Sequence, residues 1–245
     1  MGASPPVRVV LATQNRHKVE ELRALLHDSA AELVGRLTLV SLAELGVNDD
    51  VVEDGADFED NALIKARAAY ERTGLWALAD DSGLEVAALG GAPGVHSARY
   101  GGEPRSDARN LAALLQALAE VPAAQRGARF VCSLCLYGPA VVDSGAVPGA
   151  RSVGTAAHPL RLRRGQCAGS LPLSAAGTQG FGYDPLFVPD PGELIAAGLP
   201  DATLVGKTYA ELSAGQKNQL SHRTRAVRAM LPVLRALAIG LPLPA

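Results

Sequence analysis

The sequence predicts a fold of the α/β class, because short apolar runs alternate with longer segments whose apolar residues recur at helical spacing. Hydrophobic residues make up 48% of the 245 positions and charged residues 20%, as in an ordinary globular protein. A chain of this length has enough residues to bury a sizeable core. We therefore expect strands and helices packed into one or two domains.

Composition also limits the partners and the compartment. The formal net charge of −2 gives no general attraction to nucleic acid or to an anionic membrane, so any anion site has to be built locally. No apolar run approaches the roughly 20 residues of a membrane span, and residues 1–8 do not resemble a signal peptide. The odd number of cysteines, 3, is typical of a reducing compartment. We expect a cytoplasmic protein without a membrane or polymeric nucleic acid as partner.

The first strand and helix are joined by a short polar loop. Residues 7–13 read as a strand, and residues 18–26 read as an amphipathic helix. Free amide groups at a helix N-terminus attract anions, and Lys18 adds a positive charge there. The loop contains no Walker motif. Capping of the helix by Asn15 explains the same residues equally well.

A second probable strand, residues 37–41, is followed by an acidic loop at 48–55 and a helix from about 57 to 72. Gly74 is suited to end that helix. The acidic loop is explained by simple solvation. Its alternative role is to supply a second carboxylate to a metal ion.

Two adjacent carboxylates follow the next apolar run. Residues 75–79 are rich enough in apolar side chains to be a buried strand, which we expect to end on Asp80 and Asp81. Adjacent carboxylates are costly in a core because like charges repel and burial disfavours ionisation. An Asx-type turn would account for them. A Mg²⁺ ligand beside a general base would account for them as well.

Residues 128–137 form another predicted strand, which carries the C-x-x-C pair Cys132 and Cys135. Residues three apart on a strand point to opposite faces, so we expect buried structural thiols rather than a metal site. The following residues, 138–164, lack a sustained period and predict a hairpin with a flexible insertion. We also expect the tail, residues 239–245, to be disordered.

The last third of the chain contains two polar motifs. Glycines flank Phe181 and Tyr183, which lets the backbone approach a flat ligand that a ring can stack on, although a tight turn fits equally well. A capping-box pattern at 213–216 begins a short helix with Lys217. Residues 221–223, Ser-His-Arg, then supply donors for carbonyl or phosphate oxygens at the start of a final helix, or a simple local cap.

Taken together, the motifs resemble one family. They are T-x-N-x-x-K at 13–18, D-D-S-G-L-E-V at 80–86, P-G-V-x-S-A-R-Y at 93–100, G-F-G-Y-D-P at 180–185 and S-H-R at 221–223. In this order and spacing they resemble the inosine triphosphate pyrophosphatase (RdgB-like) family of noncanonical purine nucleotide pyrophosphatases. The likeness extends from about Val7 to Ala238.

The resemblance implies a pyrophosphatase that hydrolyses ITP, dITP and XTP to the monophosphate and pyrophosphate, and so cleanses the nucleotide pool. It implies Mg²⁺ as the cofactor and a homodimer as the assembly. The implied fold is a single catalytic domain over 1–245, with an elongated mixed β-sheet flanked by helices. Its two lobes would enclose a central nucleotide cleft.

Matching the motifs residue by residue also implies site roles. Asp81 would be the proton acceptor for the attacking water and a metal contact, together with Glu53 and Asp80. The triphosphate would be held by residues of the first loop with two later residues: Thr13, Gln14, Asn15, Arg16, His17, Lys18, Ser82 and Lys65. The base pocket would combine the glycine-rich loop with the last two helices: Phe181, Gly182, Tyr183, Asp184, Lys217, His222 and Arg223.

Base choice follows from hydrogen-bond polarity. Hypoxanthine and xanthine carry a 6-oxo acceptor to which His222 and Arg223 are able to donate, whereas adenine presents a 6-amino donor. Such a site rejects the wrong partner by as much as ~10⁴–10⁵. Guanine also carries a 6-oxo group, so hydrogen-bond polarity at this position does not exclude it. The alternatives are a pyrophosphatase for modified pyrimidine nucleotides and a nucleotide-binding regulatory module without turnover.

Overall fold

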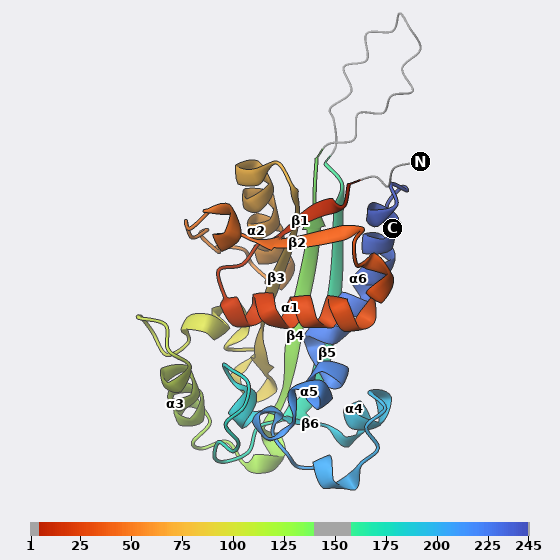
Figure 1. Ribbon diagram of the computed structural model, residues 1–245. Helices are drawn as coiled ribbons and strands as arrows, with labels where there is room; N and C mark the ends of the chain where they lie inside the picture. The colour runs from red at the N-terminus through yellow and green to blue at the C-terminus, as the bar shows by residue number, and fades with distance from the viewer. Residues whose placement is uncertain (1–4, 140–157, 245) are drawn as a thin grey trace, which may run out of the picture.

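A computed structural model describes residues 5–139 and 158–244 of the chain. Within these residues six strands form one mixed sheet in the order β2-β1-β3-β4-β5-β6 (Figure 1). β1 is parallel to both of its neighbours, and all the other pairs are antiparallel. The strands are β1 (Val7–Leu11), β2 (Leu37–Ser41), β3 (Trp76–Val86), β4 (Gly127–Tyr137), β5 (Leu160–Ser170) and β6 (Val188–Pro189).

Helices flank the sheet, as expected. They are α1 (Arg16–Ser29), α2 (Phe58–Thr73), α3 (Asp107–Ala117), α4 (Pro191–Ala196), α5 (Ala214–Leu220) and α6 (His222–Ala238). α2 ends at Gly74, whose φ of 67° is left-handed, and α5 begins with the predicted capping box. The apolar stripe of α6 is buried: Val227, Met230, Leu231, Leu234 and Leu237. No helix in the described ranges is long and apolar enough to cross a membrane.

The two faces of the upper sheet in Figure 1 are covered by different helices. α1 and α6 pack on one face, in a cluster that contains Cys132, and α2 packs on the other, in a cluster that contains Cys135. Both thiols are buried and free, which confirms the prediction made from their spacing. A third cluster lies farther along β3 and β4, where α3 and α4 pack around Phe130 and Phe187.

The expected end of β3 at the two carboxylates is wrong. Pairing with β1 stops at Leu78, but pairing with β4 continues through both aspartates to Val86. The strand continues because β4 supplies backbone partners along its whole length. Side chains alternate along a strand, so Asp80 points to the α1 and α6 face and Asp81 points to the α2 face.

β4 and β5 form the predicted hairpin, but the expected insertion is shorter than 138–164. Residues Leu160 to Arg164 belong to β5 and pair with β4, and residues 140–157 lie outside the described ranges. The described part of the tail also differs from the expected disorder. Leu243 packs against the core, and the guanidinium of Arg161 donates to the carbonyls of Leu243 at 2.7 Å and Pro244 at 2.5 Å.

Candidate active site

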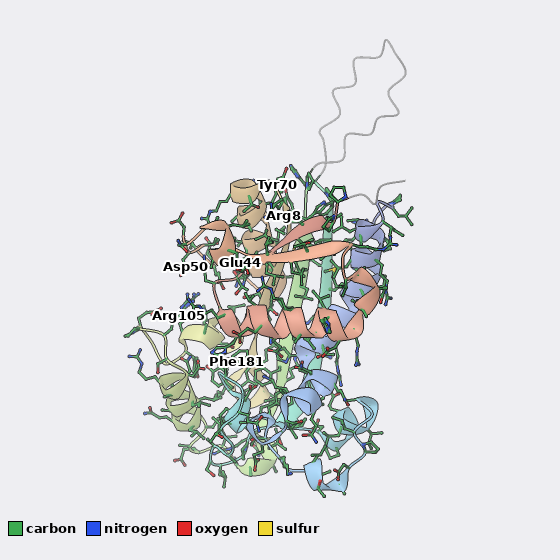
Figure 2. The ribbon with its side chains drawn as sticks, in the orientation of Figure 1. Arg8, Glu44, Asp50, Tyr70, Arg105 and Phe181 are labelled. Atoms are coloured by element: carbon green, nitrogen blue, oxygen red, sulfur yellow. The ribbon has the colours of Figure 1, made fainter. Side chains whose placement is uncertain are left out.

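Two connected cavities lie where β1 ends and β3 continues. The larger has a volume of about 260 Å³ and the smaller about 120 Å³. Figure 2 places Arg105 and Phe181 close to the level of α1, between the upper and lower parts of the molecule. The two cavities are joined by residues that line both: Asn15, Lys18, Ser82, Ala98 and Arg105.

The loop before α1 forms one wall of the smaller cavity. The side chain of Asn15 caps α1 by accepting from the amides of His17 at 3.0 Å and Lys18 at 3.3 Å. Thr13, Gln14 and Asn15 nevertheless line the cavity, so capping and ligand binding are compatible. Arg16 is exposed and lines neither cavity. His17 lies behind the larger cavity, with its ring stacked 5.5 Å from that of Phe181.

Asp80 is enclosed by cations on the α1 and α6 face. Its carboxylate pairs with the ammonium of Lys18 at 2.6 Å and with Arg223 Nε at 2.8 Å, and Ser82 donates to it at 2.8 Å. Burial raises the pKa of Asp80, but Arg223 and Lys18 outweigh it and hold that pKa well below its usual value. The side chain has no exposed surface. Asp80 thus pairs with two cations, which suits an anchoring role, and its expected metal contact stays a prediction.

Asp81 has a different environment on the α2 face. Its Oδ1 pairs with the ammonium of Lys65 at 2.5 Å, and that ammonium lies 3.6 Å from Glu53 Oε2. Its Oδ2 is buried without a hydrogen-bond partner in the described part of the chain. Burial raises the pKa of Asp81 above its usual value, although Lys65 opposes the shift. A carboxylate of this kind has an oxygen available for a water molecule or a cation.

Asp81 and Glu53 also suit a Mg²⁺ ion. The described residues contain no group of three or more His, Cys, Asp or Glu side chains arranged to hold a metal. Mg²⁺ in phosphate-processing sites is commonly held by one or two carboxylates, with substrate phosphates and waters as the other ligands. Both carboxylates line the smaller cavity, and their hard oxygen atoms are the ligand type that Mg²⁺ prefers. The residues present therefore fit the implied cofactor.

The larger cavity is built around the glycine-rich loop. The ammonium of Lys217 lies 4.7 Å from the centre of the Phe181 ring and 2.7 Å from Asp184 Oδ2, which also accepts from the Phe181 amide at 2.9 Å. Gly180 has a φ of 77°, and a Cβ there would lie 2.0 Å from Asp184 Oδ2. Only glycine fits this position, and the loop is thereby fixed with one ring facing the cavity.

His222 and Arg223 close the cavity at the start of α6. The His222 ring stacks on Phe130 at 4.7 Å, and burial followed by the charge of Arg223 lowers its pKa well below the usual value. His222 is therefore neutral, and its Nδ1 has no partner among the described residues. Arg223 lines the cavity, but its guanidinium also holds Glu21 at 2.6 Å and Ser82 at 2.9 Å. Arg223 thus supports the site as well as facing it.

Some residues of the site were not found from the sequence. Glu21 lies one turn after Lys18, so helical spacing could have placed it beside that lysine. Arg105 lies in a loop without periodicity, and nothing in the sequence marks it. Asp107 accepts from the Gly182 amide at 2.7 Å and so ties the glycine-rich loop to α3. Only tertiary structure shows that contact.

Comparisons with known proteins identify the family. The Ham1 family profile matches residues 9–233. A protein of Mycobacterium tuberculosis H37Rv named dITP/XTP pyrophosphatase is 43% identical over 233 residues, which cover 95% of this chain and 98% of that protein. The chain belongs to the Ham1 family, which confirms the resemblance and its α/β fold.

Solved structures show the same fold. A Ham1 protein from Coxiella burnetii is similar with a TM-score of 0.70 and 34% identity, over 94% of this chain and 98% of that one. The crystal structure of a nucleoside-triphosphatase or dITP/XTP pyrophosphatase from Mycobacterium abscessus is similar with a TM-score of 0.63 and 38% identity. That match covers 92% of this chain and all of the other.

Proposed function

We propose that this protein hydrolyses ITP, dITP and XTP to the monophosphate and pyrophosphate, and so removes deaminated purines from the nucleotide pool. The observation that carries the proposal is the pair of joined cavities. One contains a buried carboxylate with an unpartnered oxygen, and the other contains a partly exposed aromatic ring, that of Phe181. The names of the relatives from Mycobacterium tuberculosis and Mycobacterium abscessus support it.

Asp81 acts as the general base. Its raised pKa makes its carboxylate a better proton acceptor than an exposed aspartate, and its free Oδ2 is placed to accept from water. The water loses its proton to Asp81 and its oxygen bonds to the α-phosphorus. The bond between the α-phosphorus and the bridging oxygen of the β-phosphate then breaks, and pyrophosphate leaves. A positioned base of this kind typically contributes ~10²–10⁴ in rate.

Cations of the smaller cavity bind the triphosphate. Lys18 and Lys65 line this cavity from α1 and α2, and the N-terminus of α1 adds the positive end of its helix dipole. Mg²⁺ held by Asp81 and Glu53 supplies further positive charge to the polyphosphate when it is bound. Both lysines are already paired with carboxylates, so substrate has to compete with Asp80 and Asp81 for them.

The larger cavity binds the base. The face of Phe181 offers a stacking surface, and neutral His222 presents ring nitrogens to a purine edge. A donor at this edge favours the 6-oxo group of hypoxanthine and xanthine over the 6-amino group of adenine. The homodimeric assembly and cytoplasmic location implied by the family resemblance stay predictions.

The test is pyrophosphate release from ITP, XTP, GTP, ATP and dTTP with Mg²⁺. We expect strong release from ITP and XTP alone, and loss of release when Mg²⁺ is chelated. Equal release from all the triphosphates would support a hydrolase but contradict the proposed selectivity for the 6-oxo purine bases. Nucleotide binding without release would contradict the enzyme and support a regulatory module.

A further inference from the structure

Arg105 differs from the other cations of the two cavities. Of the lysines and arginines that line them, Lys18, Lys65, Lys217 and Arg223 each form an ion pair with a carboxylate. Arg72 donates to the Asp49 carbonyl at 3.2 Å. Arg105 makes no hydrogen bond or ion pair within the described ranges, and its side chain is exposed. It is therefore the cation of the site whose charge is not engaged.

The loop that carries Arg105 is held on both sides. Before it, the Gly101 amide donates to Asn110 Oδ1 at 2.7 Å and the Glu103 carbonyl accepts from Arg109 at 3.3 Å. After it, Ser106 caps α3. The backbone of the loop is thus anchored to α3, while the Arg105 guanidinium is available to bind a ligand. Figure 2 labels Arg105 on this loop, beside the start of α1.

Arg105 also lies at the junction of the cavities, because it lines both of them together with Lys18 and Ser82. A nucleotide with its base in the larger cavity and its outer phosphates in the smaller one passes this junction with its sugar and α-phosphate. A planar guanidinium forms two parallel hydrogen bonds with phosphate oxygens, which suits it to a group at this point.

We propose that Arg105 is a substrate-binding residue that contacts the α-phosphate of the bound nucleotide. The assignment rests on the proposed function for the orientation of the nucleotide. It extends that function by naming a group that holds the monophosphate part of the substrate. The contact is present in the nucleoside monophosphate product and absent in free pyrophosphate.

Binding of IMP and of pyrophosphate, measured directly by titration, tests the assignment without turnover. The variants are Arg105→Ala and Arg105→Lys, with Arg36→Ala as the matched control, because Arg36 is an exposed arginine in the turn before β2 and lines neither cavity. We expect Arg105→Ala to weaken IMP binding about tenfold and to leave pyrophosphate binding unchanged. Arg105→Lys should recover part of the loss, and Arg36→Ala should match the wild type.

Two results would overturn the proposal. One is IMP binding by Arg105→Ala equal to that of the wild type, and the other is a loss confined to pyrophosphate, which would place Arg105 on the outer phosphates. Failure of the proposed function is read separately, as wild-type protein that releases no pyrophosphate from ITP. If the wild type binds IMP but does not turn over ITP, weaker IMP binding by Arg105→Ala would still support Arg105 as the monophosphate contact.

Discussion

Two neighbouring aspartates lie on opposite faces of β3, and their pKa values shift in opposite directions. Asp80 faces α1 and α6, where two cations and a hydroxyl bond to its carboxylate, and its pKa is lowered. Asp81 faces α2, where one lysine pairs with a single oxygen, and its pKa is raised. Both carboxylates are buried. The difference shows that the number of cations around a buried carboxylate decides whether its pKa is lowered or raised.

The largest expected effect is a loss of turnover when Asp81, on the α2 face of β3, is changed. Asp81→Asn removes the proton acceptor and keeps the shape, so we expect kcat to fall about 10³-fold or more, with ITP binding still detectable. Pyrophosphate release and ITP titration on the same preparation measure this. A variant that kept most of the wild-type rate would remove Asp81 from the mechanism.

The next largest effect is a loss of stability when Asp80, on the α1 and α6 face of β3, is changed. Asp80→Ala leaves Lys18 without its counterion and Arg223 with Glu21 alone, and we expect a loss of about 3–5 kcal/mol in the free energy of unfolding. Urea denaturation measures it. Glu32→Ala, which breaks an exposed ion pair with Arg235, is the control and should leave the midpoint unchanged. Equal midpoints for the two variants would contradict the anchoring role of Asp80.

A third prediction separates binding from packing in the aromatic residues. Phe181 is partly exposed in the larger cavity, and loss of base stacking in Phe181→Ala should cost about 1–3 kcal/mol, seen as a rise in KM for ITP. Its melting temperature should change little. Phe187 is fully buried, so Phe187→Ala should instead lose about 3–5 kcal/mol of stability. The reverse pattern would place Phe181 in the core and away from the ligand.

The smallest effect is the dependence of stability on pH. The folded-state pKa of His222 is well below its unfolded value near 6.5, so below that pH the unfolded chain binds a proton that the folded chain does not. Stability is full above about pH 6.5 and falls as the pH drops toward the folded pKa, by at most about 1.4 kcal/mol per unit.

Urea midpoints at pH 7.5 and 5.5 measure this change, with His222→Asn as the comparison. The variant should lose most of the pH dependence over this range. An identical slope in the variant and the wild type would assign the effect to another group.

Local signals in the sequence predicted local structure well. The capping box before α5 and the end of α2 at Gly74 were predicted correctly, and capping by Asn15 was one of two alternatives, because a cap depends on residues within one turn. The buried stripe of α6 is a signal of the same local kind, since helical spacing fixes which residues share a face.

Caps and helical spacing do not predict contacts between segments that are distant in the sequence. The end of β3 was misplaced because its partner strand β4 lies about 50 residues later and keeps pairing past the carboxylates. The bond between Arg223 and Asp80 spans 143 positions, and no periodicity reports it. The family resemblance placed Arg223 in the base pocket, but only the structure shows its guanidinium fixed by two carboxylates.

The long ladder between β3 and β4 has a consequence for the fidelity of folding. It pairs residues continuously from Ala77 opposite Tyr137 to Val86 opposite Ala128. A slip of one residue along it would exchange the faces of the two aspartates, which would place the base among the anchoring cations and the anchor beside Lys65. The chain would still be a folded α/β protein, but it would have no usable base. The chemistry of the site therefore depends on the register of this ladder as well as on the fold.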